Sequence, residues 1–204
     1  LNQRLAHYNH YDYCLVRYIE DSSNQWFQKL DLIETCIKYM HYRDSFYRFD
    51  SSKRFAQLLN SEFERLNFAY RIVGNEIVEI TSEQEIKAIE NAIDKSPSNI
   101  KMHLNSALEK YAQRPTGDYR NSIKESISAV EAFCREKTGE NTLGKALKQL
   151  ESKGIVIPPL LNSAFEKLYA YTNQGDTGIR HALMDDEGNY TPTAEEALFM
   201  LISC

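Results

Sequence analysis

Helix-breaking residues are scarce in this sequence, which has 8 Gly and 5 Pro among 204 residues. Apolar side chains recur at three- and four-residue steps over residues 26–40 and again over residues 55–66, which is the period of an amphipathic helix. Few breakers combined with this period favour long helices. We therefore predict a mainly α fold.

The strongest strand signal lies at residues 70–80, where two runs rich in β-branched residues flank Gly74 and Asn75. This pattern predicts a small β-hairpin. Ser82 followed three residues later by Glu85 forms a capping box, so a helix should begin there. Turn-forming residues then gather at positions 96–99. We place a boundary here, between an N-terminal helical region with the hairpin (residues 1–95) and a helical bundle (residues 96–204).

Helical periodicity dominates the second region. Asp118 is a suitable N-cap for a helix whose apolar face carries Ile123, Ile127 and Val130. The spacing predicts further helices over residues 102–111, 143–150, 159–171 and 193–204.

Charge and composition limit the classes of partner. With 24 basic and 29 acidic residues the formal charge is −5, whereas a domain that coats duplex DNA is normally basic. We therefore expect no duplex DNA partner, and any RNA contact must be local. Apolar runs are too short for a membrane span and no charged leader precedes one, so we expect a cytoplasmic protein without membrane contacts.

Several common types of chemistry find no support in the sequence. The four cysteines include no Cys-x-x-Cys pair, so we expect free thiols rather than a zinc ribbon or a redox site. Phosphate-binding glycine loops, nucleophile elbows and zinc-protease motifs are absent from the sequence. We expect no cofactor. A metal site at His7, His10 and Asp12 or at residues 185–187 is a weaker interpretation than a solvated segment, so we predict no metal.

The dipeptide Arg180-His181 follows a turn-rich stretch and is the most informative candidate for catalysis. Histidine exchanges protons near neutral pH, and a neighbouring guanidinium can hold a phosphate. Together they suit acid/base chemistry on an RNA phosphodiester, whose 2′-hydroxyl can serve as nucleophile without a metal. The alternative is structural: Arg180 pairs with an acid and His181 packs beside a helix.

The helix that begins after Asp118 also has a polar side. Its residues are spaced to line one side of the helix, where they could hold a substrate or orient a catalytic histidine: Arg120, Asn121, Lys124, Glu125 and Ser128. The alternative interpretation is an ordinary solvated face with mixed charges.

Four strings in the second half resemble the HEPN-type C-terminal domain of bacterial abortive-infection proteins of the AbiJ group. They lie at residues 118–131, 142–147, 165–169 and 178–183. The hairpin and the residues that follow it, up to Ile86, resemble the segment that precedes this domain in the same proteins. The resemblance covers roughly residues 60–204, and residues 1–60 match only loosely as a variable helical region.

The resemblance implies an all-helical HEPN bundle that forms a homodimer, with a metal-independent endoribonuclease site where two protomers meet. In nuclease members an arginine precedes the catalytic histidine by four to six residues, whereas Arg180 directly precedes His181 here. Only His181 is therefore carried over by position. We assign Arg180 to the phosphate, Asn121 and Glu125 to orienting His181, and Arg120, Lys124 and Ser128 to substrate binding. The alternative is a catalytically inactive HEPN module that binds RNA, a nucleotide or a partner protein.

Overall fold

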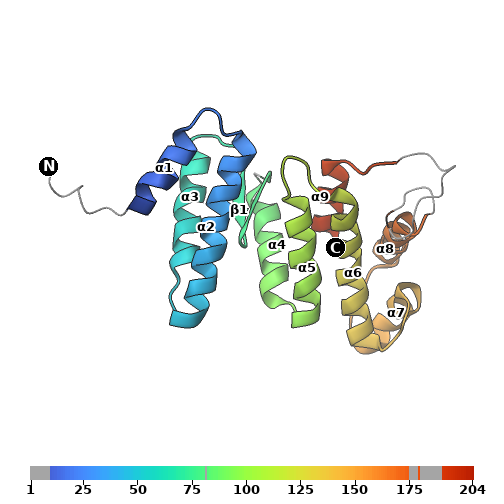
Figure 1. The fold of residues 1–204 in the computed structure, drawn as a ribbon. Helices are drawn as coiled ribbons and strands as arrows, with labels where there is room; N and C mark the ends of the chain where they lie inside the picture. Colours follow the sequence, from blue (N-terminus) through green and yellow to red (C-terminus); the bar gives the residue numbers. More distant parts are fainter. Residues whose placement is uncertain (1–9, 81, 175–178, 180–189) are drawn as a thin grey trace. The chain divides into compact units, whose positions relative to one another are not determined.

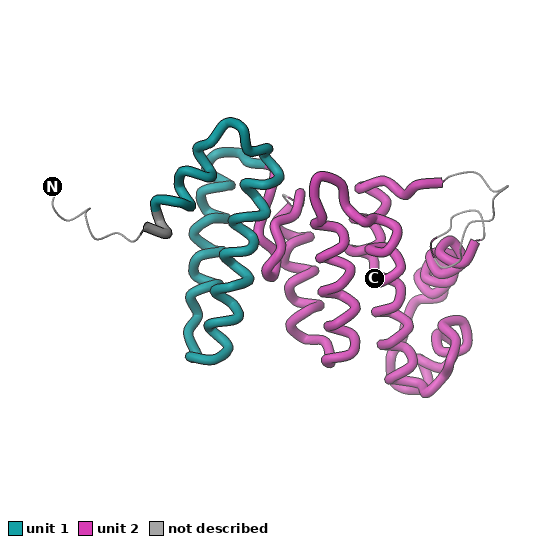
Figure 2. The backbone as a smooth tube through the Cα atoms, viewed as in Figure 1, with its two compact units in different colours: residues 1–68 teal, residues 69–204 magenta. Residues whose placement is uncertain are grey.

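The computed structural model describes residues 10–80, 82–174, 179 and 190–204. Helices account for most of this part of the chain, and the only strands within it form one small antiparallel hairpin, so the predicted mainly α fold is confirmed. The chain forms two compact units, residues 1–68 (unit 1) and residues 69–204 (unit 2) (Figure 2). None of the described helices combines the length and apolar character that spanning a bilayer requires.

Unit 1 is helical in its described part. Its elements are α1 (His10–Glu20), α2 (Trp26–Tyr47) and α3 (Ser51–Arg65). Figure 1 shows α2 and α3 side by side, joined by a short turn. The sequence predicted α2 only as far as Met40. The helix continues to Tyr47 because neither glycine nor proline interrupts residues 41–47.

The turn between α2 and α3 is held by a buried polar contact. The Oδ2 atom of Asp44, near the end of α2, accepts hydrogen bonds from the backbone N–H of Ser52 at 2.7 Å and from its hydroxyl at 2.8 Å. Asp50 stands at the N-cap position of α3, yet its side chain makes no cap hydrogen bond. The preceding helix therefore caps α3 through Asp44.

Unit 2 begins with the predicted hairpin. Strands β1 (Arg71–Val73) and β2 (Glu76–Val78) pair antiparallel with Ile72 opposite Ile77. Gly74 has a φ of +60° in the turn between them, a conformation that glycine adopts without steric cost. The guanidinium of Arg114 donates a hydrogen bond of 2.7 Å to the carbonyl of Ile77, which ties the hairpin to the chain after α5.

The rest of unit 2 is a helical bundle arranged around α6. Its elements are α4 (Glu83–Lys95), α5 (Ser98–Tyr111), α6 (Tyr119–Thr138), α7 (Leu143–Leu150), the 3-10 turn η2 (Glu151–Lys153), α8 (Pro159–Thr172) and α9 (Ala194–Ser203). Helix α6 packs against α5, α7, α8 and α9 (Figure 1). Ser82 and Asp118 accept hydrogen bonds from the first turns of α4 and α6, which confirms both as N-caps. At Ser82 the bond from the Glu85 N–H is one half of the predicted capping box.

The core of unit 2 lies against the apolar face of α6, as predicted. Ile123 and Ile127 are fully buried, and Val73 and Val78 of the hairpin join the same cluster. The two compact units meet in the sequence between residues 68 and 69. The boundary predicted between residues 95 and 96 instead falls inside unit 2, between α4 and α5, and these two helices pack against each other.

Candidate functional site

Polar side chains follow one side of α6, opposite the side that carries Ile123 and Ile127. We call this set the polar face of α6: Arg120, Asn121, Lys124, Glu125 and Ser128. Lys124 is exposed and the other four are half-buried. Their positions in the sequence place them within about 140° around the helix axis. The structure therefore brings together all the predicted site residues that belong to α6.

Glu125 contacts a histidine that the sequence analysis did not select. The Nδ1 atom of His103, on α5, lies 2.7 Å from Oε2 of Glu125. The side chains are 30% and 23% exposed, so solvent reaches the pair while part of its surface is shielded. Because a carboxylate can only accept, Nδ1 carries the hydrogen of this bond, and in a neutral imidazole Nε2 then has the lone pair. The pair can thus act as a general base.

Antiparallel packing of α5 and α6 creates this pair. The Ser122 hydroxyl donates to the Ala107 carbonyl at 2.8 Å, one turn from His103, and the rings of Tyr111 and Tyr119 lie 6.0 Å apart a further turn on. Both Ser122 and Ala107 are fully buried. The two helices are therefore in close contact at their buried sides, and His103 and Glu125 meet at the partly exposed edge of the same interface.

Two members of the polar face make local hydrogen bonds. The Nδ2 atom of Asn121 donates to Oδ2 of Asp118 at 2.8 Å, and its backbone N–H donates to Oδ1 at 3.2 Å. The hydroxyl of Ser128 donates to the carbonyl of Lys124 at 2.8 Å. Asn121 thus belongs to the N-cap of α6, and Ser128 is bonded within its own helix.

Arg120 connects α6 to a chain of hydroxyl groups. Its Nη2 donates to the carbonyl of Tyr190, and the Tyr190 hydroxyl donates to Oε1 of Glu196 on α9. The hydroxyl of Tyr171, on α8, lies 2.9 Å from that of Tyr190. Since the Tyr190 proton is directed to Glu196, Tyr171 is the donor in the second bond. Side chains from α6, α8 and α9 therefore converge at Tyr190.

Burial keeps these two phenols protonated. It is the main reason that the pKa values of Tyr171 and Tyr190 are raised, and for Tyr190 the hydrogen bond to Glu196 raises the pKa further. Both hydroxyls remain donors at neutral pH. Tyr171 therefore donates to Tyr190, and Tyr190 donates to Glu196, throughout the neutral pH range.

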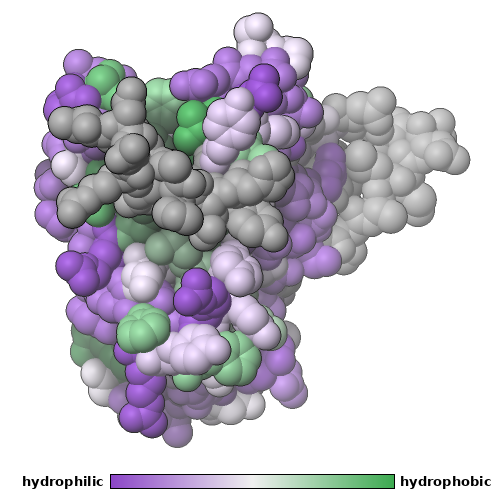
Figure 3. Space-filling model, turned by 60° about the vertical axis from the view of Figure 1, so that its left-hand side comes forward, coloured by the Kyte–Doolittle hydropathy of each residue, from purple (hydrophilic) through white to green (hydrophobic). Residues whose placement is uncertain are grey.

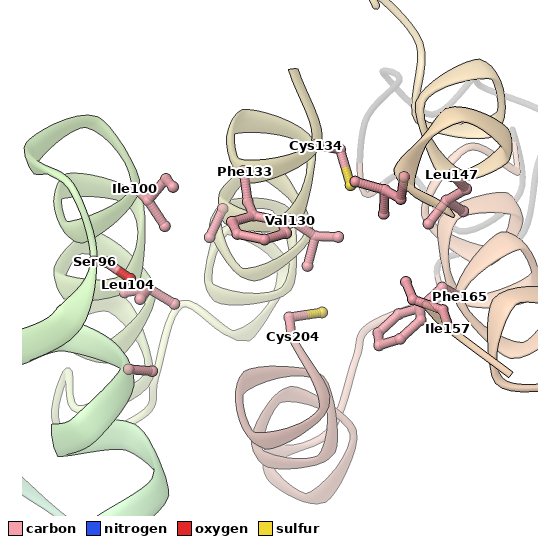
Figure 4. A pocket seen from close by; sticks show the side chains of 13 residues that line it. Ser96, Ile100, Leu104, Val130, Phe133, Cys134, Leu147, Ile157, Phe165 and Cys204 are labelled. Carbon is pink, nitrogen blue, oxygen red and sulfur yellow. The ribbon is translucent and has the colours of Figure 1, made fainter. Parts of the chain in front are cut away.

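A separate cavity of about 230 Å³ lies on the other side of α6 (Figure 4). Apolar side chains line it, including Leu104, Val130 and Phe165, together with the thiols of Cys134 and Cys204. Burial raises the pKa of Cys134 to about 11 and that of Cys204 to about 12. Neither thiol is ionised at neutral pH, so neither serves as a thiolate nucleophile in this cavity.

Two predicted catalytic residues, Arg180 and His181, lie outside the described residues. The side chains of residues 7–12 and the acidic residues 185–187 do so as well. Ile179, which precedes Arg180 in the sequence, is described and is 3% exposed in the core of unit 2. Among the described residues, no group of three or more His, Cys, Asp or Glu side chains is placed to hold a metal ion.

The sequence does contain a pattern that could have singled out His103. It belongs to a polar row at helical spacing on one side of α5: Asn99, His103, Ser106 and Lys110. Its pairing with Glu125 depends on how α5 and α6 pack, and spacing within one helix does not report that. Tyr190 lies in no periodic segment, so no pattern singled it out.

The comparisons with known proteins bear on the first half of the chain. Residues 2–95 match the family model described as AbiJ N-terminal domain 4. The similarity supports the AbiJ part of the resemblance, and it covers the region where that resemblance was loosest. It ends at residue 95 and gives no support to the HEPN part of the resemblance. A search of curated proteins and a search of solved structures each gave no significant match.

Proposed function

We propose that this protein acts in bacterial phage defence as an abortive-infection protein, and that residues 96–204 are a HEPN-like bundle that cleaves RNA without a metal ion. The similarity of residues 2–95 to AbiJ N-terminal domain 4 supports the defence role. The 2.7 Å contact between His103 and Glu125 is the observation that carries the proposed chemistry. Cytoplasmic RNA is the substrate in this proposal, and a homodimer is the active form.

The proposed reaction is transfer of the phosphate to the neighbouring 2′-oxygen. The 2′-oxygen forms a bond to phosphorus while the bond to the 5′-oxygen breaks, which leaves a 2′,3′-cyclic phosphate and a 5′-hydroxyl. Nε2 of His103, oriented by Glu125, takes the proton from the 2′-hydroxyl. His181, in its protonated form, gives a proton to the departing 5′-oxygen. Protonation states near neutral pH suit histidine to both tasks.

Cations hold the phosphate in this scheme. Arg180 steadies the charge that develops on the phosphate oxygens, and Arg120 and Lys124 bind the adjoining backbone. Asn121 and Ser128 contribute indirectly, because Asn121 is bonded to the N-cap of α6 and Ser128 to a carbonyl in the middle of the same helix. Since Glu125 is bonded to His103, the proposal gives this carboxylate to His103 rather than to His181.

A second candidate function is a catalytically inactive HEPN module that binds RNA, a nucleotide or a partner protein. A specific observation favours it. Arg120, Asn121 and Ser128 each have a hydrogen-bond partner within the same chain, as expected of a structural network. Under this alternative the His103–Glu125 pair links α5 to α6 and transfers no proton.

An RNA-cleavage assay in EDTA tests the first proposal. The proteins are wild type, His103→Ala, His181→Ala and Glu125→Gln, with Glu136→Gln as a control because Glu136 is an exposed residue of the same helix. We expect each histidine variant to cleave at least about a hundredfold more slowly and the control to match wild type. Products should end in a cyclic phosphate, and native mass spectrometry should detect a dimer.

Two results would contradict the proposal. Equal cleavage by wild type and His181→Ala would assign the activity to a contaminant, and it would favour the binding module. A strict monomer would remove the homodimer from the scheme. Circular dichroism of each variant shows whether loss of activity reflects loss of the fold.

A further inference from the structure

An exposed aromatic stripe runs along the second half of α2 in unit 1. Its rings recur about once per turn and continue into the residues that follow the helix: Tyr39, Tyr42, Phe46, Tyr47 and Phe49. Each is 60–65% exposed. Leu30, Ile37 and Asp44, the buried residues of α2, lie on the opposite side of the helix. The rings therefore take no part in the core, although exposing large apolar surface is unfavourable.

Cations are interleaved with these rings. Arg43 lies between Tyr42 and Phe46 on the same side of α2, and Arg48 separates Tyr47 from Phe49. Residues 38–54 contain five Lys or Arg against two Asp, in a chain whose formal charge is −5. One of the two acids, Asp44, is buried in its contact with Ser52. The exposed charge of this segment is thus strongly positive.

Four of these five cations are available for a ligand. Lys38 forms an ion pair with Glu34 at 3.0 Å. Arg43, Arg48, Lys53 and Arg54 form no ion pair with any residue in the described part of the chain. Figure 3, which brings the left-hand side of Figure 1 forward, shows green and pale side chains mixed with purple ones over the visible surface. Because Arg43 and Arg48 are interleaved with its rings, the stripe is not a purely apolar patch of the kind that buries itself in another apolar surface.

The backbone at Arg48 adds an independent observation. Arg48 ends α2 with a φ of +54°, the left-handed conformation for which glycine is preferred at this position. In this conformation an arginine has a higher conformational energy than a glycine would have. Strain at a residue that also carries an exposed, unpaired cation suggests that the side chain has a use.

We infer that the aromatic stripe of α2, together with Arg43 and Arg48, binds single-stranded RNA. Bases that are not already stacked can lie on the rings of Tyr42 and Phe46, while the two guanidinium groups contact phosphates. A duplex hides its base faces, so it could use only the cations. The surface belongs to unit 1 and contains no residue of the polar face of α6, so the inference goes beyond the proposed cleavage and does not depend on it.

Fluorescence anisotropy with a labelled 2′-O-methyl RNA of about ten nucleotides tests this inference. The probe lacks the 2′-hydroxyl nucleophile, so binding is measured without cleavage. We expect Tyr42→Ala and Phe46→Ala, each in the full chain, to weaken binding about fivefold or more. Phe199→Ala removes a ring of similar exposure from unit 2 and should leave the affinity unchanged.

Arg48→Gly gives a sharper test because affinity and stability should move in different directions. The affinity should fall, and the slope of log K against log salt should decrease by about 0.7, the share of one phosphate contact on a single strand. The melting temperature should stay the same or rise, since glycine removes the left-handed strain. Arg65→Gln, which removes a cation paired with Glu62 at the other end of α3, should leave the affinity unchanged.

Three results would overturn the inference. One is equal affinity of wild type and the ring variants for the probe, and another is equal competition by duplex RNA. The third is that the ring variants lose only self-association or a protein partner in sedimentation, which would assign the stripe to a protein interface. The probe cannot be cleaved, so its affinity for wild type and for the ring variants does not depend on the proposed cleavage chemistry. A failure of the cleavage proposal and a failure of this inference therefore give different results.

Discussion

Gly117 occupies a crowded turn between α5 and α6. A Cβ atom added there would lie 2.6 Å from the carbonyl oxygen of Tyr111 and would also overlap the ring of Tyr119. The neighbouring N–H of Asp118 donates to the Lys110 carbonyl at 2.9 Å, so the backbone has little freedom to move away. The close packing around residue 117 therefore leaves no room for a side chain.

We predict that Gly117→Ala lowers the free energy of unfolding by about 1–3 kcal/mol, the usual cost of overpacking. Urea denaturation followed by circular dichroism measures the effect. Gly144→Ala is the matched control, because a Cβ at Gly144 meets nothing within 4 Å and the residue lies within α7. The control should be neutral or stabilising. Equal stability of the two variants would show that the turn accommodates a side chain.

At the scale of elements, the contact of Asp44 with Ser52 determines how α3 begins. Hydrogen bonds from Ser52, first of all from its backbone N–H, hold the pKa of the Asp44 carboxyl below its usual range. A carboxyl whose pKa is lowered on folding stabilises the fold above its unfolded pKa. That contribution is lost as the pH falls through the folded pKa.

We predict that Asp44→Asn makes the helicity of unit 1 less dependent on pH as the pH falls from about 5 to below the usual aspartate pKa of about 3.9. At neutral pH the variant should be less stable than wild type, because the charged acceptor is gone. Urea unfolding monitored by amide exchange in α2 and α3 measures both effects. Asp50→Asn should behave like wild type, since Asp50 makes no cap hydrogen bond. An Asp50 effect as large as that of Asp44 would contradict this assignment.

Local patterns in the sequence predicted most elements of the fold but few contacts between them. The hairpin, the caps at Ser82 and Asp118 and the apolar face of α6 depend on neighbouring residues, and the structure confirms them. Helix α1 was not predicted, although its apolar residues, among them Cys14, Leu15 and Tyr18, recur at helical spacing. The caps and pairs that join different helices were also missed, such as Asp44 with Ser52 and His103 with Glu125. Such pairs depend on how helices pack, and helical periodicity does not specify packing partners.

At the scale of the whole molecule, the two units differ in how much apolar surface they bury. Among the described residues, Leu30 and Ile37 are the only buried hydrophobic side chains of unit 1, whereas the core of unit 2 includes Ile123, Ile127 and Leu143. Since burial of apolar surface is the main stabilising contribution, most of the stability of the chain resides in unit 2.

We predict that Ile127→Asp lowers the free energy of unfolding of unit 2 by several kcal/mol, because it places a carboxylate in an apolar core. Differential scanning calorimetry and amide exchange in α5 and α6 measure the loss. Leu160→Asp is the matched control, since Leu160 is 87% exposed. Near-native melting of Ile127→Asp would mean that the apolar face of α6 has been assigned to the wrong side.

The position of α6 among four other helices has a consequence for how this protein can evolve. One side of α6 is fixed by core packing, and the other side by hydrogen bonds to α5, to its own cap and to Tyr190. Between the two sides, Ser122 and Ser126 are buried and bonded to backbone carbonyls. Few positions of α6 can therefore be substituted without loss of a contact. Mutational scanning should find α6 among the least substitutable segments of the chain, and the solvent-facing positions of α7 and α8 among the most permissive.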